Sequence, residues 1–204
     1  MTKRLFDIIL ALILLTLFSP LIAVIAVLIK IKMGSPVIFK QKRPGLHGKP
    51  FYLFKFRTMT TQVDSHGQLL DDKKRLTGLG SCLRKYSLDE LPQLLNVIYG
   101  DLSFVGPRPL LMSYLDRYTP EQTRRHNVKP GITGWAQVNG RNAITWEDRF
   151  NLDLWYVDNH NFWIDIKILF ITFLKVIKAE GINQDSSVTM PEYQGSDPGD
   201  NGNN

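Results

Sequence analysis

The first thirty residues contain a long apolar segment. No charged residue occurs from Ile8 to Ile29, and lysines follow at positions 30 and 32. As an α-helix the segment would be roughly 33 Å long, which is enough to cross the hydrocarbon core of a bilayer. It is too long for the apolar part of a signal peptide, and no small-residue cleavage pattern follows it. The segment therefore predicts attachment to a membrane.

Two details argue against a simple transmembrane span. Ser19-Pro20 lies in the middle of the segment, where proline removes a backbone hydrogen bond and bends a helix. Basic residues flank the segment on both sides, so charge indicates no orientation. We expect residues 1–32 to form a re-entrant helix-break-helix, with Ser19 bonding a carbonyl that Pro20 frees. An ordinary kinked span is the alternative.

The composition fits one compact domain beside this membrane element. Of 204 residues, 25 are Lys or Arg and 19 are Asp or Glu, which gives a net charge of +6. The excess suits an anionic partner such as a phospholipid or a nucleotide, whereas scattered cations and an apolar N-terminus argue against nucleic acid. The single cysteine, Cys82, allows no disulfide within the chain and favours a cytosolic body. The four histidines lack metal-ligand spacing, so no zinc site is expected.

A hairpin is predicted after the apolar segment. Val37–Lys40 and Phe51–Arg57 have the pattern of short strands, and a loop rich in turn residues joins them. Alternation would place Lys55 and Arg57 on one face, as an anion clamp requires. A solvated strand edge is the alternative.

The remaining elements are predicted to be helical. We expect helices at 73–86, at 88–98 with Gly100 closing the second, and at 162–178. The last is amphipathic and aromatic-rich, and would lie on the membrane or pack against the core. The fold class is therefore mainly α with a small β-hairpin (α+β). Residues 33–183 would form the cytosolic domain, and the polar residues 184–204 a disordered tail.

Asp89 and Glu90 are adjacent carboxylates within Ser87-Leu88-Asp89-Glu90-Leu91-Pro92. Ser87 and Glu90 have the spacing of a helix capping box, which is the structural alternative for Glu90. Pro92 would then fall inside the helix, whereas a later helix start would place both carboxylates in the preceding turn. An ionised Asp there can be a nucleophile at phosphorus or a Mg²⁺ ligand. Neighbouring helical residues do not share a face, so the two should have different roles.

Two turn-rich loops are candidates for ligand binding. In Gly106-Pro107-Arg108-Pro109 the prolines restrict the backbone around Arg108, whose guanidinium would act as a phosphate fork. In Pro130-Gly131-Ile132-Thr133-Gly134 the glycines would let the backbone approach a ligand closely, although the loop matches no phosphate-binding fingerprint. A structural turn is the alternative for the first loop.

These motifs together resemble those of the small monotopic phosphoglycosyl transferases, or bacterial sugar transferases. The resemblance runs from about Lys3 to Gly181, with its motifs in the family's order. They are Lys3-Arg4-Leu5-Phe6-Asp7, Ser19-Pro20, Lys55-Phe56-Arg57-Thr58-Met59, the carboxylate motif continued to Leu94, Gly106-Pro107-Arg108-Pro109-Leu110, Pro130-Gly131-Ile132-Thr133-Gly134 and Gln137-Val138-Asn139-Gly140-Arg141-Asn142-Ala143.

The resemblance implies transfer of a phosphosugar from a UDP-sugar to a polyprenol phosphate such as undecaprenyl phosphate, giving a polyprenyl diphosphate sugar and UMP. It implies Mg²⁺ as cofactor and ping-pong catalysis. Asp89 would be the nucleophile, the site of a covalent phosphosugar intermediate and a metal ligand, with Glu90 as its helper. The family's anion-binding cations fall on Lys55, Arg84, Arg108 and Arg141, and Arg57 joins them as the second clamp residue. The family's N-terminal helix is re-entrant and broken at its Ser-Pro, here Ser19-Pro20.

UDP-sugars are cytosolic, so the enzyme would act on the cytoplasmic face of the bacterial inner membrane, in contact with phospholipid. It would catalyse the first membrane step of glycoconjugate and polysaccharide biosynthesis. The run from Gly140 to Trp146 resembles enzymes that act on N-acetylated sugars. A Mg²⁺-dependent hydrolase of nucleotide or lipid diphosphates is the enzymatic alternative, and a peripheral membrane scaffold is the non-enzymatic one. The sequence leaves the sugar, the polyprenol length and a homodimer open.

Overall fold

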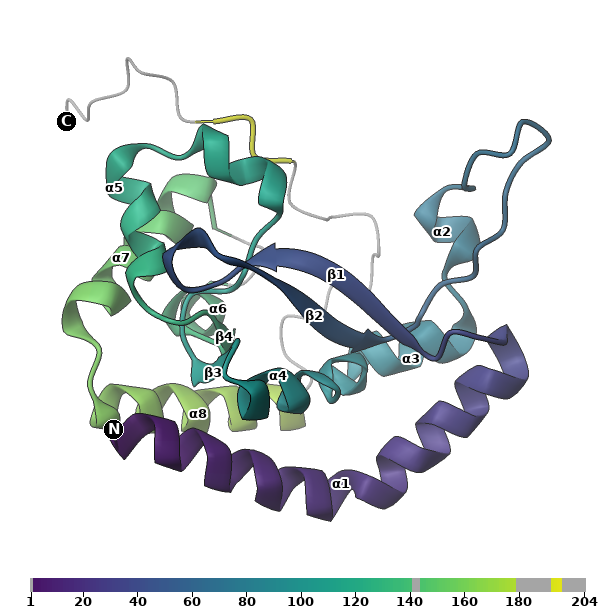
Figure 1. Cartoon of the computed structure of the whole chain (residues 1–204), viewed down its shortest axis with the longest axis horizontal. Coiled ribbons are helices and arrows are strands. Elements are labelled where there is room, and N and C mark those ends of the chain that lie inside the picture. Colours follow the sequence, from purple (N-terminus) through teal and green to yellow (C-terminus); the bar gives the residue numbers. More distant parts are fainter. Residues whose placement is uncertain (1, 141–143, 179–191, 196–204) are drawn as a thin grey trace. The chain divides into compact units, whose positions relative to one another are not determined.

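The computed structural model describes residues 2–140, 144–178 and 192–195 (Figure 1). The chain divides into two compact units, each built from separate segments of the sequence. The first unit consists of Met1–Gln41, Leu53–Gly100 and Lys175–Ser186, and the second of Lys42–Tyr52, Asp101–Leu174 and Ser187–Asn204.

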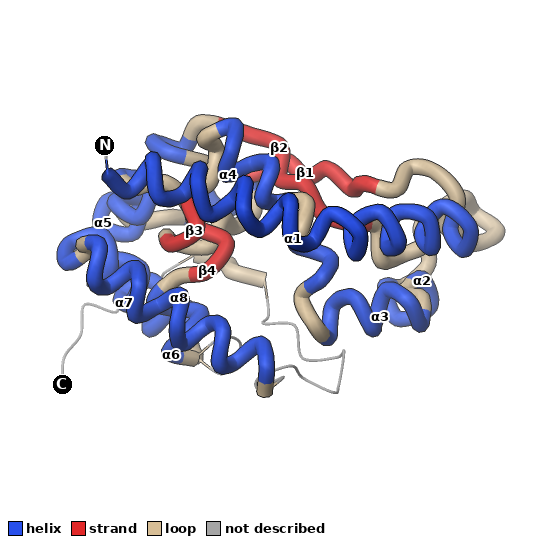
Figure 2. The backbone as a smooth tube through the Cα atoms, turned by 90° about the horizontal axis from the view of Figure 1, so that it is seen from below, coloured by secondary structure: helices blue, strands red, loops and turns tan. Residues whose placement is uncertain are grey.

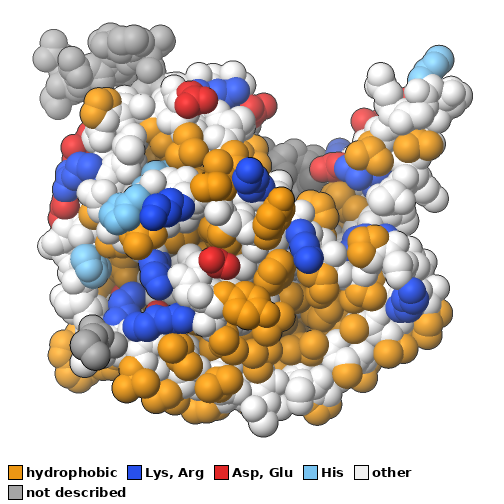
Figure 3. Space-filling model, viewed as in Figure 1, with side chains coloured by type: hydrophobic (Ala, Val, Ile, Leu, Met, Phe, Trp, Pro, Cys, Tyr) orange, Lys and Arg blue, Asp and Glu red, His pale blue; other side chains and the backbone are white. Residues whose placement is uncertain are grey.

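The first unit begins with the long helix α1 (Thr2–Met33). By length and composition this helix could cross a membrane, and its most apolar 18-residue window has a mean hydropathy of 2.9. Only 11% of that window is buried, whereas a core helix of a soluble protein would bury most of it. Hydrophobic side chains accordingly line the outer surface along α1 (Figure 3).

Helix α1 continues through Ser19-Pro20 and bends about halfway along its length (Figure 1). Proline has no N–H to give to the carbonyl four residues earlier, which belongs to Thr16. The Ser19 hydroxyl donates to that carbonyl at 2.9 Å. The predicted hydrogen bond of Ser19 is therefore confirmed, while the predicted break is a bend in a continuous helix.

Both ends of α1 are fastened inside the first unit. Near the N-terminus, Arg4 donates to the carbonyls of Val97 and, at 2.8 Å, of Ile98. At the other end, Arg57 donates to the carbonyls of Met33, Gly34 and Ser35, the last at 3.0 Å. The last carbonyls of a helix lack partners within it, so a guanidinium there satisfies and neutralises them.

A hairpin and three short helices complete the first unit. The base of the hairpin formed by β1 (Ile38–Pro44) and β2 (Pro50–Phe56) lies here, followed by α2 (Asp72–Arg75), α3 (Gly78–Lys85) and α4 (Gln93–Tyr99). The apolar core joins α1, β2 and α3 through Ile25, Ile29, Phe56 and Leu83. The predicted hairpin is thus confirmed. The predicted end of a helix at Gly100 is also confirmed, since Gly100 ends α4 with a φ of 91°.

The helix predicted at 73–86 is wrong as a single element, because it is split between α2 and α3. Leu76 leaves the helical conformation and forms a bridge with Met59. Thr77 then caps α3, its hydroxyl accepting from the Gly80 N–H at 2.9 Å. The interruption thus comes from pairing with a distant segment.

The second unit contains a parallel pair of three-residue strands and four further α-helices among its described residues. Strand β3 (Ser103–Val105) pairs with β4 (Gly131–Thr133), with Ser103 opposite Gly131 (Figure 2). The helices are α5 (Pro120–Thr123), α6 (Trp135–Asn139), α7 (Trp146–Asn159) and α8 (Phe162–Ile177). The unit also contains the short 3-10 helices η1 (Leu46–Gly48), η3 (Met112–Arg117) and η4 (Arg124–Asn127).

Helix α8 confirms the amphipathic helix predicted at 162–178. Its Asp165 and Ile168 are buried, whereas Trp163, Phe170 and Phe173 are exposed. The aromatic side chains therefore do not pack into the core. This arrangement agrees with a helix that lies on a membrane surface.

Glycines let β3 and β4 approach each other closely. A Cβ on Gly106 would lie 2.2 Å from the Lys129 carbonyl oxygen, and one on Gly131 would lie 2.2 Å from the Gly106 nitrogen. A Cβ on Gly134 would likewise meet the Gly106 carbonyl oxygen at 2.2 Å. The glycines of the two loops thus let backbone approach backbone, while the expected approach of 130–134 to a ligand stays a prediction.

The core of the second unit is aromatic. Its buried members are Leu110, Tyr114, Phe150 and Tyr193, with Trp146 packed against them. Tyr193 belongs to the segment predicted as a disordered tail, of which the structure describes residues 192–195. These four residues depart from the prediction because their tyrosine is only 3% exposed.

His126 is a buried histidine of this unit. Its ring lies 5.7 Å from that of Tyr118, and it hydrogen-bonds the backbone of Gly45. Burial, assisted by the charge of Arg125, lowers the pKa of His126 from 6.5 to about 4. The folded state therefore holds this imidazole neutral where an unfolded chain would protonate it.

We predict that Gly106→Ala destabilises the second unit by about 2–3 kcal/mol, because the new methyl group would overlap backbone atoms that cannot move independently. Thermal unfolding of the detergent-solubilised protein measures the change. Gly78→Ala is the matched control, since nothing lies within 4 Å of its added Cβ. Equal unfolding temperatures for Gly106→Ala and the unsubstituted protein would contradict the proposed backbone packing.

We predict that stability falls in mild acid because of His126. At pH values between about 4, the pKa of His126 in the folded protein, and 6.5, its ordinary pKa, this histidine binds a proton in the unfolded chain and not in the folded protein. The free energy of unfolding should therefore fall by about 2 kcal/mol from pH 7.5 to pH 5. His126→Gln should lose this part of the pH dependence, and His47→Gln, at an exposed histidine of the same unit, should keep it. Identical pH profiles for both variants would contradict the assignment.

Candidate active site

Asp89 and Glu90 lie in one 3-10 turn, η2 (Leu88–Glu90), just before α4. Pro92 occupies the N-cap of α4, since further inside the helix its missing N–H would cost a hydrogen bond. Ser87 has a φ of 55° and its side chain makes no capping hydrogen bond. The capping box is therefore not formed, and both carboxylates lie in the turn before the helix, as the alternative predicts.

Glu90 forms an ion pair in this turn, and Asp89 is buried. Glu90 Oε1 accepts from Lys55 Nζ at 2.7 Å, and the two side chains are only 16% and 21% exposed. Asp89 is buried, with 8% of the residue exposed. The ion pair holds Glu90 against the end of β2. The geometry thus brings Lys55 to the carboxylate turn.

Arg57 has a structural position that the sequence did not indicate. Strand β2 ends at Phe56, so the alternation that predicted a clamp stops before Arg57. Arg57 is 7% exposed and its guanidinium bonds the carbonyls at the end of α1. The clamp of Lys55 and Arg57 is therefore not formed, and nothing in this geometry supports Arg57 as a substrate ligand.

Arg84 lies in the last turn of α3 and is exposed. Its Nε donates to the hydroxyl of Thr58 at 3.1 Å. Thr58 is buried, and its backbone oxygen accepts from the Thr77 N–H at 3.3 Å. Thr58 thus fastens the start of α3 and orients Arg84. Thr58 belongs to the family motif Lys55–Met59, and this motif is the only feature of the sequence that indicates the residue.

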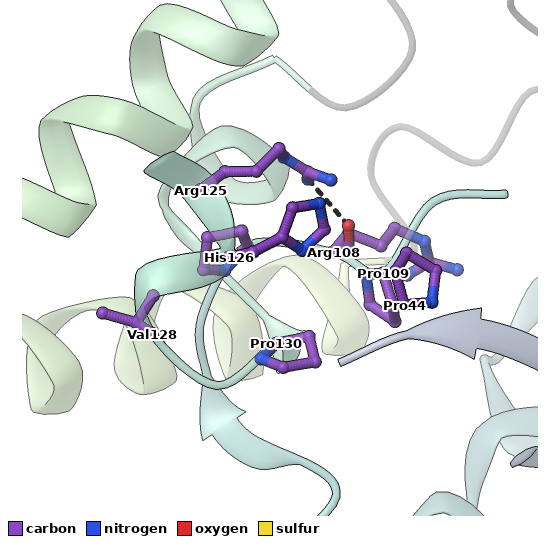
Figure 4. A pocket seen from close by; sticks show the side chains of 8 residues that line it. Pro44, Arg108, Pro109, Arg125, His126, Val128 and Pro130 are labelled. Carbon is purple, nitrogen blue, oxygen red and sulfur yellow. Dashed lines mark hydrogen bonds between the residues drawn. The ribbon is translucent and has the colours of Figure 1, made fainter. Parts of the chain in front are cut away.

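Arg108 belongs to the second unit, in a hollow that is lined by prolines and by two residues of η4, Arg125 and His126 (Figure 4). The Arg108 carbonyl accepts from Arg125 Nη2 at 2.8 Å. Arg125 also donates to Asp153 Oδ2 at 2.6 and 3.2 Å, and both of these side chains are 2% exposed. This buried pair therefore fixes the backbone at Arg108.

The surroundings of Arg108 are strongly cationic. Burial, and then the charge of Arg108, lowers the pKa of Arg43 to about 10. Burial also lowers the pKa of Arg149, with the charges of Arg108 and Arg125 acting in the same direction and Asp153 opposing them. Cations gathered in this way favour an anionic ligand. Arg43 and Arg149 were not singled out in the sequence, because only folding brings them near Arg108.

Arg141, the remaining predicted substrate-binding residue, lies outside the described residues. Within the described part of the chain no three His, Cys, Asp or Glu side chains form a metal-binding group. Mg²⁺ is commonly held by one or two carboxylates together with substrate phosphates. Asp89 fits that mode as a single protein ligand, so the chemistry of the turn is compatible with the predicted magnesium.

Comparison with known proteins identifies the family. The profile of the family described as bacterial sugar transferase matches residues 1–179. EpsL of Bacillus subtilis strain 168, named as an uncharacterized sugar transferase, is 61% identical over 194 residues, which are 95% of this chain and 96% of that protein.

Two relatives with named activities are longer proteins. The UDP-glucose:undecaprenyl-phosphate glucose-1-phosphate transferase of Escherichia coli K12 is 43% identical over 85% of this chain and 39% of its own length. The UDP-N-acetylgalactosamine-undecaprenyl-phosphate N-acetylgalactosaminephosphotransferase of Aeromonas hydrophila is 40% identical over 88% of this chain and 44% of its own length. The chain therefore spans about two fifths of these two relatives. It belongs to the bacterial sugar transferase family, the phosphoglycosyl transferases.

Proposed function

We propose that this enzyme transfers a phosphosugar from a UDP-sugar to undecaprenyl phosphate, producing undecaprenyl diphosphate sugar and UMP. The observation that carries the proposal is the carboxylate turn: Lys55 pairs with Glu90, and the adjacent Asp89 is buried in the same 3-10 turn. The names of the relatives supply the substrate class. The reaction is the first membrane step of glycoconjugate biosynthesis.

Two displacements at the β-phosphorus make up the proposed mechanism. An Asp89 carboxylate oxygen bonds to the β-phosphorus, the bond from that phosphorus to the bridging oxygen breaks, and UMP leaves. An oxygen of undecaprenyl phosphate then attacks the same phosphorus and releases the Asp89 carboxylate. A covalent intermediate divides one difficult transfer into two easier steps. Catalysis is therefore ping-pong.

Charge repulsion is the main obstacle, because an anionic carboxylate attacks an anionic diphosphate. Positioning and cations lower such barriers in phosphoryl transfer. Lys55, Arg84 and Arg108 are the described residues proposed for this task, and Arg141 is proposed with them. A Mg²⁺ ion held by Asp89 and substrate phosphates would neutralise further negative charge. Glu90 positions the Lys55 ammonium group through their ion pair.

The donor sugar is proposed to be N-acetylated. One named relative acts on UDP-N-acetylgalactosamine and another on UDP-glucose, so the family accepts both kinds of sugar. The resemblance of residues 140–146 to enzymes for N-acetylated sugars favours the first kind. Release of UMP from a panel of UDP-sugars, with undecaprenyl phosphate as acceptor, tests this choice.

The membrane arrangement that we propose is re-entrant. Arg4 and Arg57 fasten the two ends of α1 to the same unit, whereas a spanning helix would place its ends on opposite sides of the bilayer. The bend at Ser19-Pro20 provides the change of direction. The catalytic residues then face the cytoplasm at the inner membrane, with the exposed aromatics of α8 in contact with phospholipid.

We predict that Asp89→Asn lowers transfer by at least about a thousandfold, because the amide is a poor nucleophile. Glu90→Gln should lower it by about a hundredfold through loss of the Lys55 pair. UMP release and lipid-linked product are measured with the preferred donor, and Glu147→Gln, at an exposed carboxylate of α7, is the control. Near-normal turnover by Asp89→Asn would rule out its role as nucleophile.

The unsubstituted enzyme without acceptor should release about one UMP per active site and then stop, since the intermediate waits for undecaprenyl phosphate. Continuous UMP release without acceptor would identify the hydrolase instead. Release of no UMP from any donor would exclude the proposed transferase.

We predict that a cysteine inserted before Thr2 reacts with a membrane-impermeant maleimide in inverted vesicles and not in intact spheroplasts. The re-entrant helix returns both of its ends to the cytoplasmic side. The test uses a Cys82→Ser background, because Cys82 is exposed, and Lys49→Cys reports the side on which the body lies. Labelling of the inserted cysteine in spheroplasts would establish a spanning helix.

A further inference from the structure

The C-terminal segment Glu192–Gly195 packs into the second unit through one aromatic side chain. Tyr193 is 3% exposed, and its ring lies 5.1 Å from Phe150 and 5.6 Å from Tyr114, both in edge-to-face geometry. The Trp146 ring lies at 5.5 Å. Such contacts add to the free energy of burying the ring. Tyr193 is therefore a core residue contributed from far along the chain.

Polar contacts fix this segment in one position. The Tyr193 hydroxyl lies 2.8 Å from Gln122 Oε1 and 3.2 Å from the Arg117 carbonyl oxygen. The Tyr193 N–H donates to the Tyr114 hydroxyl at 3.3 Å. Arg117 donates to the Tyr193 carbonyl and pairs with Glu192 at 3.0 Å. The ring, the hydroxyl and the backbone of Tyr193 are thus all held.

The aromatic core also supports the loop that carries Arg108. Leu110, two residues after Arg108, belongs to the same buried cluster as Tyr193. On another side of the cluster, Tyr118 lies 5.9 Å from the Tyr193 ring. These contacts place Tyr193 against the segment that leaves the Arg108 loop.

A second route from Tyr193 to Arg108 passes through Arg125. Arg125 stacks over the ring of Tyr118 at 5.8 Å and bonds the Arg108 carbonyl at 2.8 Å. Gln122, whose oxygen meets the Tyr193 hydroxyl, belongs to α5, directly before the 3-10 helix that contains Arg125. Loss of Tyr193 would therefore loosen both supports of the Arg108 backbone.

We propose that Tyr193 is a positioning residue of the enzyme: the C-terminal segment 192–195 completes the aromatic core and so aims Arg108 at the diphosphate of the UDP-sugar. The inference rests on the proposed function, which assigns Arg108 to that diphosphate. Tyr193 itself touches neither substrate nor reacting atoms. It acts through Leu110 and through Arg125.

Truncation tests the inference. A chain that ends at Pro191 lacks the segment, and a chain that ends at Ser196 keeps it. The shorter chain should show a KM for the UDP-sugar about tenfold higher, which is the loss expected from one misplaced charged contact. The longer chain should match the full chain. Equal KM values for all three chains would overturn the inference.

Single substitutions separate positioning from general stability. Tyr193→Ala should raise the KM for the UDP-sugar by about tenfold, whereas Tyr193→Phe keeps the ring and should restore most of the affinity. A purely structural role would reduce the fraction of folded enzyme, which lowers kcat and leaves KM unchanged. Tyr193→Ala with normal KM and reduced kcat would therefore overturn the proposal.

Binding of UDP keeps this test independent of turnover. UDP carries the diphosphate without the sugar, so its dissociation constant should also rise about tenfold in Tyr193→Ala and in the chain ending at Pro191. If the full chain releases no UMP from any donor, the proposed transferase fails while this comparison still stands. If the full chain releases UMP but UDP binds equally to all variants, the role of Tyr193 fails instead.

Discussion

Two guanidinium groups, those of Arg4 and Arg57, hold the ends of the apolar helix to one compact unit. Each bonds backbone carbonyls at or just beyond a helix C-terminus, Arg4 at the end of α4 and Arg57 at the end of α1 and in the two residues that follow it. Carbonyls in the last turn of a helix are incompletely bonded within the helix, and leaving such a buried group unsatisfied would cost about 1–3 kcal/mol. Because α4 follows the carboxylate turn and Arg57 follows Lys55, the same contacts tie the apolar helix α1 to the residues proposed for catalysis.

The second unit uses buried charge for a similar purpose. An ion pair such as Arg125–Asp153 contributes little net stability, since desolvation offsets most of the attraction. Burial raises the pKa of Asp153 and the charge of Arg125 opposes this rise. What the pair supplies is position, because the guanidinium that holds Asp153 also bonds the Arg108 carbonyl. Removing either partner would leave an uncompensated charge beneath the loop.

Local features were predictable from the sequence, and long-range ones were not. The hydrogen bond from Ser19 to Thr16, the end of α4 at Gly100 and the hairpin depend on residues close together in the chain. The capping box failed although its spacing was correct, because Pro92 shifts the start of the helix beyond the carboxylates. Arg57 and Tyr193 were misjudged because their partners lie more than twenty residues away, and neither periodicity nor composition reports such contacts. The family motifs located Asp89 and Arg108 without describing what holds them.

The Arg108 loop is constrained on both sides by contacts that leave it little freedom. At its start, Gly106 lies so close to the backbone of Gly131 that neither residue has room for a side chain. At its end, Leu110 is buried in the aromatic core that Tyr193 completes. Prolines flank Arg108 and restrict the backbone between these two points. A side chain on so rigid a base loses less entropy when it binds a phosphate, and this preorganisation favours recognition of a charged ligand. The paired glycines and Tyr193 thus both limit the movement of the backbone that carries Arg108.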